Sequence, residues 1–397
     1  MYGNKKKKSS RTYQKNTQNR MKITSLVFTF FIGVLLQYSP PFKLLSQLLI
    51  IFSLLTIIYI HIKNQASVAV PTKLWTLSCV ISVLFIFHLI RLQNLYQLVR
   101  VPVYVFVLIS VLFIIPYNVH EKKVLHIISI VFGLMVVFAL PTEIIGTYQV
   151  GAFTISYTSG VAGFFNPNGF GMVAVIGTIS SFSGIVSNQS SRVKVAFLSI
   201  CITCILGVIL SNSRLAIGLL VIGAVTYSAG VYYGSRTQTG IIIGGITAAV
   251  AFLILTITQP ESILVKSILK YDRPDLWAAS VQAIAKRPLL GYGFGQAPEA
   301  IGDFYKIKSP HNGYLNFTIQ TGSVGLSILV SYLMLLLKRL FWNDDIDPAV
   351  GTLFFLMLLQ MFFEGTIPFG WGVFPLMIQV CCGYIGLSCI SKNKSTK

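Results

Sequence analysis

Residues 193–233 contain two apolar runs that follow each other almost directly. The first is VKVAFLSICITCILGVIL (193–210) and the second is LAIGLLVIGAVTYSAGVYY (215–233), and only Ser211-Asn-Ser-Arg214 separates them. Each run has close to the ~20 residues that an α-helix needs to cross a bilayer core. The stretch therefore predicts two membrane-spanning helices joined by a very tight connection.

Similar runs recur along the 397-residue chain, bounded by charge, Pro or Asn. The complete set is 23–38, 44–62, 74–90, 99–116, 124–140, 169–187, 193–210, 215–233, 240–257, 314–337, 348–366 and 371–390. Only 11% of the residues are charged, against about a quarter in soluble proteins. Because no ten-residue alternation suggests a barrel, we predict an all-α, polytopic membrane protein of about 12 transmembrane helices, with residues 1–397 as one integral membrane domain.

The distribution of Lys and Arg predicts the orientation. The net charge of +20 would suit nucleic acid, but eight of the 31 Lys and Arg precede residue 23 and most others lie in short gaps between the runs. Twelve spans place both termini in the cytoplasm, with residues 1–22 as a basic tail and 20 cations inside. Seven of the 11 outer cations lie in 258–313, and long loops cross largely regardless of charge. We expect no nucleic-acid partner.

The basic N-terminal segment and the apolar run from Ile23 together resemble a secretory signal peptide, but they lack a small-residue cleavage site. We therefore expect the run from Ile23 to be a retained first span.

Two outer segments are long. The first is 141–168, and the second, 258–313, is the expected large extracytoplasmic loop between helices 9 and 10. Pro274 suits the first turn of a helix that Lys286-Arg287-Pro288 would end. Trp277, Val281 and Ile284 would share one face of this short amphipathic helix, which would lie on the membrane or cover a cavity. Gly291-Tyr-Gly-Phe-Gly295 would follow as a bend.

Two clusters have a structural interpretation. All six cysteines fall inside apolar runs, so Cys201-x-x-Cys204 suggests buried side chains rather than a disulfide or a metal site. Asp344-Asp345-Ile-Asp347 directly precedes Pro348 at an expected helix start, where carboxylates complement the helix dipole. We expect neither a metal nor a cofactor.

Three outer side chains are candidates for chemistry. His311 belongs to the large loop and is suited to proton transfer near neutral pH, or it is only a polar boundary residue. Arg214 lies at headgroup depth, where a guanidinium would bind a lipid pyrophosphate, although a lone arginine there can simply reach the interface. Glu364, near the outer end of its span, is a rival base.

Four ordered segments resemble the O-antigen ligase and O-antigen polymerase superfamily. His311-Asn312, followed by Gly322 and Gly325, is similar to its signature, and three further segments support the match. These are Phe165-Asn166-Pro167-Asn168, Ser211-Asn-Ser-Arg214, and Asp272-Arg273-Pro-Asp-Leu-Trp277 with Arg287-Pro-Leu-Leu-Gly-Tyr-Gly293. The resemblance covers roughly residues 150–330.

This resemblance implies transfer of a glycan from an undecaprenyl-pyrophosphate carrier to an acceptor hydroxyl on the outer face of the bacterial cytoplasmic membrane. It implies a metal-independent, inverting glycosyltransferase with Arg214, Arg273 and His311 as catalytic residues. Arg287 is the alternative candidate for the second catalytic arginine if Arg273 is not the residue that aligns with the family motif. The other expected substrate-binding residues are Asn166, Asn168, Asn312 and Trp277. Expected partners are the lipid-linked oligosaccharide, membrane lipids, a flippase and a chain-length regulator.

The resemblance leaves polymerase and ligase open, because the acceptor decides between them. Lys outnumbers Arg 21 to 10 and Ile is abundant, which hints at an AT-rich genome and favours a capsule or exopolysaccharide polymerase over an O-antigen-type ligase. A lipid-linked glycan flippase would also have about twelve spans, but transporters commonly show two related halves, which are not evident here. A non-catalytic partner in polysaccharide export is a third alternative.

Overall fold

The structure of the chain is a computed structural model. It describes residues 21–34, 43–63, 107–139, 146–150, 153–157, 167–259, 261–262, 273–293, 297–302, 310–365 and 373–387. These residues belong to two compact units, one formed by Met1–Val68 with Ser110–Val221 and the other by Ala69–Ile109 with Ile222–Lys397. Each unit is described by itself. The predicted span 74–90 lies outside the described residues.

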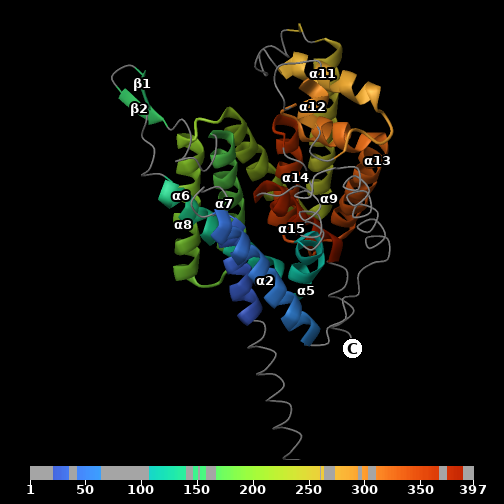
Figure 1. Cartoon of the computed structure of the whole chain (residues 1–397). Helices are drawn as coiled ribbons and strands as arrows, with labels where there is room; N and C mark the ends of the chain where they lie inside the picture. Colours follow the sequence, from blue (N-terminus) through green and yellow to red (C-terminus); the bar gives the residue numbers. More distant parts are fainter. Residues whose placement is uncertain are drawn as a thin grey trace, which may run out of the picture. The chain divides into compact units, whose positions relative to one another are not determined.

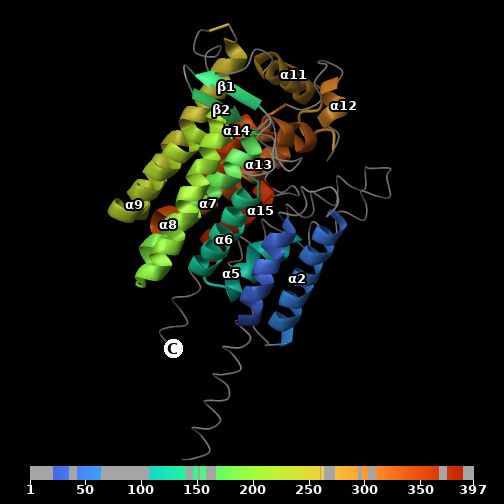
Figure 2. The same cartoon turned by 90° about the vertical axis from the view of Figure 1, so that its left-hand side faces the viewer.

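The first unit is built from apolar helices. They are Met21–Val34, α2 (Lys43–Lys63), the π-helical turn Ser110–Ile114, α5 (Ile115–Asn118), α6 (Glu121–Ala139), α7 (Pro167–Ser187), α8 (Ser191–Leu210) and the start of α9. Helices α6, α7 and α8 pack together (Figure 2). Small residues allow this close approach: a Cβ at Gly177 would lie 2.6 Å from Sγ of Cys204.

The expected outer segment 141–168 contains a β-hairpin that the sequence pattern did not predict. Strand β1 (Gly146–Val150) pairs antiparallel with β2 (Phe153–Tyr157), and Val150 faces Phe153 at the closed end. The two strands form the sole sheet among the described residues. The predicted all-α architecture therefore holds for the spans, with this hairpin as an addition between α6 and α7.

Helix α9 (Arg214–Thr258) is 45 residues long and is interrupted at Gly234, where φ is +82°. A Cβ at Gly230 would lie 2.9 Å from Cδ of Gln238, although residues eight apart are separated by about 12 Å along a straight helix. The chain therefore bends sharply at Gly234, which separates the two predicted spans 215–233 and 240–257. Only Gly234 leaves the helical conformation, so the second half of the helix begins directly after the break.

Among its described residues, the second unit contains the rest of α9 and five further helices. They are α11 (Arg273–Lys286), α12 (Ala297–Gly302), α13 (Gly313–Trp342), α14 (Pro348–Phe363) and α15 (Val373–Leu387). Helices α11 and α12 lie together beside α13 (Figure 1). The predicted helix of the large loop is thus confirmed, from its start near Pro274 to its end at Lys286.

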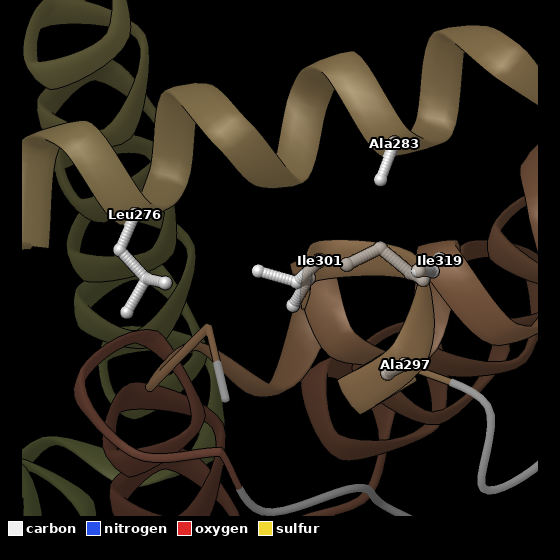
Figure 3. Packing of buried hydrophobic residues seen from close by; sticks show 6 residues of the cluster. Leu276, Ala283, Ala297, Ile301 and Ile319 are labelled. Atoms are coloured by element: carbon white, nitrogen blue, oxygen red, sulfur yellow. The ribbon is translucent and has the colours of Figure 1, made fainter. Parts of the chain in front are cut away.

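The buried face of α11 lies against α12 and α13. Leu276 and Ala283 pack with Ile301 of α12 and Ile319 of α13 in an apolar cluster (Figure 3). Trp277 is also buried, but Val281 is 36% exposed. Two helices contact α11, and the contact surface follows Leu276, Ser280 and Ala283. That Trp277, Val281 and Ile284 form a face toward the membrane or a cavity stays a prediction.

Six of the described helices are long and apolar enough to cross a membrane, namely α2, α6, α7, α8, α9 and α13, and four shorter helices are apolar as well. The protein is a multi-pass membrane protein.

The Asp cluster has the predicted structural role: Asp347 caps α14 by accepting the N–H of Ala349 at 2.9 Å, and Asp344 accepts the N–H of Ser235 just after the break in α9. Cys201 and Cys204 are buried free thiols, as expected.

Candidate functional site

In the first unit, two of the motif segments meet. The Ser213 hydroxyl at the start of α9 donates a 2.7 Å hydrogen bond to Oδ1 of Asn168 on α7. A Cβ at Gly171 of α7 would lie 2.6 Å from Oγ of Ser211. The tight connection between α8 and α9 is therefore fixed against the start of α7. Arg214 follows it as the first residue of α9, and its side chain is exposed.

In the second unit, α13 is broken at Gly322, where φ is +66°. The break frees backbone groups, and the segment after α11 pairs with them. Tyr292 N–H donates to Ile319 O at 2.9 Å and Gly293 N–H to Gln320 O at 2.9 Å, while Ser323 N–H donates to Pro288 O at 2.7 Å. The Arg287–Gly293 motif is thus joined to the Gly322 motif by backbone hydrogen bonds.

Glycine is needed at this junction for steric reasons. A Cβ at Gly322 would lie 2.2 Å from the carbonyl oxygen of Leu289, and one at Gly291 would lie 2.5 Å from that of Ile319. Both residues also have positive φ, which L side chains rarely adopt. Both glycines belong to the segments that carry the family resemblance, and the backbone geometry of this junction requires glycine at each position.

The residue before His311 is held by α11. Nε1 of Trp277, whose side chain is only 1% exposed, donates a 3.0 Å hydrogen bond to the carbonyl oxygen of Pro310. His311 is half-buried and has a φ of +45°, an uncommon conformation for a residue other than glycine. Because Pro310 and Asn312 are both held by other helices, the left-handed backbone of His311 sets the direction in which its imidazole leaves the chain.

Asn312 fixes the other side of His311. It is the N-cap of α13, since its Oδ1 accepts the N–H of Leu315 at 3.0 Å, and its Nδ2 donates to Phe362 O on α14 at 3.1 Å. The side chain is fully buried. The Asn therefore uses both ends of its amide to join the start of α13 to the end of α14.

Arg273, the first residue of α11, reaches the same end of α14. Its Nη1 donates a 2.9 Å hydrogen bond to Phe363 O, the carbonyl next to the one that Asn312 binds. Arg287 follows the opposite end of α11, about 20 Å away along a helix of 14 residues. There its guanidinium lies over the ring of Tyr292, 4.7 Å from the centroid.

The structure thus brings the expected site residues into two groups. In the second unit, Trp277 binds the residue before His311, and Asn312 and Arg273 bind consecutive carbonyls at the end of α14. Asn168 lies beside the connection that leads to Arg214 in the first unit. Arg287 belongs to the second unit but lies at the junction with the broken α13, and Asn166 lies outside the described residues.

Two polar residues of this region were not singled out from the sequence. Asn316 Nδ2 donates to Gly365 O at 3.0 Å, and Gln320 Nε2 donates to Oδ1 of Asn316 at 2.7 Å. Both lie one helical turn apart on α13, in line with Asn312. The sequence could have indicated Asn316 and Gln320, because both are amide side chains within an apolar span, where polar groups are costly and often functional.

A comparison with protein families found one match. Residues 197–330, about a third of the chain, match the family model Wzy_C, described as O-antigen ligase. The match covers Arg214, Arg273, Arg287 and the His311-Asn312 pair, whereas Asn168 precedes it. No match was found among curated proteins. The chain is therefore a multi-pass membrane protein that carries an O-antigen ligase family domain at residues 197–330.

Proposed function

We propose that the protein is a polysaccharide polymerase that transfers a glycan from an undecaprenyl-pyrophosphate carrier to an acceptor hydroxyl at the outer face of the bacterial cytoplasmic membrane. The observation that carries the proposal is that the matched segment contains both expected arginines and a His311 whose two neighbours are held by other helices. An enzyme must hold a reacting group in place, and this turn is held on both sides.

The leaving group is a lipid pyrophosphate, so cations are needed where its charge develops. Arg214 begins a membrane-spanning helix, and its exposed guanidinium suits binding of phosphate oxygens in a bidentate manner. Arg273 uses one N–H for Phe363 O, and a guanidinium has five. Its other N–H groups are of the kind that binds phosphate oxygens.

The reaction is a direct displacement. The acceptor oxygen attacks the anomeric carbon of the sugar, the bond to the pyrophosphate oxygen breaks, and the configuration inverts. His311 contacts the acceptor hydroxyl and orients it for in-line attack. Isolation of a covalent glycosyl-enzyme intermediate would contradict this mechanism.

The test uses the purified protein in nanodiscs with undecaprenyl-pyrophosphate-linked repeat units. Wild type, Arg214→Ala, Arg273→Ala and His311→Ala are compared by gel electrophoresis of the glycan products. A ladder from wild type that disappears in the three folded variants supports the proposal. Transfer of a single finished glycan to an added lipid or wall acceptor, without a ladder, would identify a ligase instead.

A double-mutant cycle within the second unit tests whether Arg273 and His311 act on one substrate. If the two side chains stabilise the same transition state, the rate loss of the double variant is much smaller than the product of the single losses. Independent, multiplicative losses would contradict a shared site.

A further inference from the structure

Three side chains from two other helices bind the backbone around Glu364. Asn312 Nδ2 donates to Phe362 O at 3.1 Å, Arg273 Nη1 to Phe363 O at 2.9 Å, and Asn316 Nδ2 to Gly365 O at 3.0 Å. The N–H of Glu364 itself donates to Gln360 O at 2.9 Å. The carbonyls on both sides of Glu364 are therefore fixed by α11 and α13.

These bonds also satisfy the end of α14. The last carbonyls of a helix have no partner within the helix, and in an apolar setting each must find one elsewhere. Asn312 and Arg273 supply donors to two consecutive carbonyls, where a solvent-exposed helix would use water. The result is that Glu364, the C-cap residue with φ −135° and ψ 148°, leaves the helix in a defined direction.

A carboxylate is an unfavourable choice at this position for helix stability alone. The C-terminus of a helix carries a partial negative charge that favours cations, and acidic groups within apolar spans are rare and mostly functional. The side chain of Glu364 is half-buried at the end of a largely buried helix. Its occurrence there, directly beside the carbonyl that Arg273 binds, indicates a role in the reaction.

We propose that Glu364 is the proton acceptor of the transfer reaction, and that the hydrogen bonds from Arg273, Asn312 and Asn316 fix the backbone from which its side chain extends. This inference rests on the proposed function. As the acceptor oxygen bonds to the anomeric carbon, its proton passes to the Glu364 carboxylate, and the electron pair of the broken bond leaves with undecaprenyl pyrophosphate. A carboxylate can serve as the general base of such a step. His311 orients the hydroxyl.

The experiment measures turnover and donor affinity of the full chain in nanodiscs for wild type, Glu364→Gln, Glu364→Asp and Glu364→Ala. Because general-base catalysis contributes about 10²–10⁴-fold, Glu364→Gln should lower turnover at least about 100-fold while donor affinity stays within about twofold. Added formate should restore part of the turnover of Glu364→Ala, since a small carboxylate can occupy the vacated space, and should not restore that of His311→Gln. Glu299→Gln, an exposed acid on α12, is the matched control and should equal wild type.

The outcomes separate this inference from the proposed function. Turnover of Glu364→Gln within about twofold of wild type would overturn the role of Glu364 and leave the glycan transfer intact. Failure of formate to restore turnover of folded Glu364→Ala would also overturn it, because a purely structural Glu would behave in that way. Absence of product from wild type would overturn the proposed function and this inference together.

Discussion

The indole N–H of Trp277 donates a 3.0 Å hydrogen bond to the carbonyl oxygen of Pro310, the residue that precedes His311. Trp277 lies on the helix of the large loop, and His311 lies 34 residues later at the start of a membrane-spanning helix. A buried Trp that was expected to contact substrate therefore acts on the backbone beside the candidate catalytic His. This contact makes the position of His311 depend on the packing of α11.

Trp277→Phe should lower turnover without unfolding the protein. The ring keeps most of its packing, but Pro310 O loses its donor, and a net hydrogen bond is worth about 1 kcal/mol or about fivefold in an equilibrium. The measurement is kcat and KM for glycan transfer, together with the melting temperature in detergent. Trp342→Phe, at a residue 66% exposed, is the control and should match wild type. Equal kcat values for both variants would show that the contact does not position His311.

Gly322→Ala should destabilise the second unit by at least about 2 kcal/mol, because it adds backbone strain and disrupts the pairing with the Pro288–Gly293 segment. Its Cβ would lie 2.2 Å from Leu289 O. Gly240→Ala is the matched control, since a Cβ there meets nothing within 4 Å. Thermal unfolding of both variants in the same detergent checks the prediction, and a Gly322→Ala variant as stable as Gly240→Ala would refute the described junction.

Asn312→Ser should separate the two functions of this side chain. A Ser hydroxyl can still cap α13, but it is too short to donate to Phe362 O on α14. We expect a modest loss of stability of about 1 kcal/mol and a larger loss of turnover, because the end of α14 is released. Asn312→Ala should lose the cap as well and be less stable than Asn312→Ser. If the two variants are equally stable and fully active, Asn312 holds neither element.

Residues 258–313 should be extracytoplasmic, as the distribution of Lys and Arg predicts. In a cysteine-free background, Glu299→Cys on α12 should react with a membrane-impermeant maleimide in intact cells, because this position is exposed. Tyr233→Cys, next to the break in α9 and 75% exposed, should react only after the cells are opened. The reverse pattern would invert the predicted topology.

The sequence predicted those features that depend on local chemistry. The lengths of the apolar runs predicted the long apolar helices among the described residues, including the two halves of α9, and Pro274 with Lys286 bounded α11 because both act on adjacent turns. The capping role of Asp347 also followed from its place before Pro348. These properties are decided within a few residues, so they can be read without tertiary structure.

Other features depend on contacts between distant segments. The pairing of residues 288–293 with the broken α13 follows from which backbone groups meet, and no periodicity records it. The packing of Leu276 and Ala283 of α11 against α12 and α13 likewise depends on contacts between distant segments. The three hydrogen bonds around Glu364 come from residues 48 to 91 positions earlier in the chain, so the sequence offered this acid only as a rival base.

The most direct test of the central claim is the release of undecaprenyl pyrophosphate during incubation of the nanodisc-embedded protein with its lipid-linked repeat unit. The account predicts that wild type releases one undecaprenyl pyrophosphate for every glycosidic bond formed and that folded His311→Gln releases almost none. Wild-type protein that moves the lipid-linked glycan across the membrane of a vesicle, without releasing undecaprenyl pyrophosphate, would contradict the account and identify a transporter.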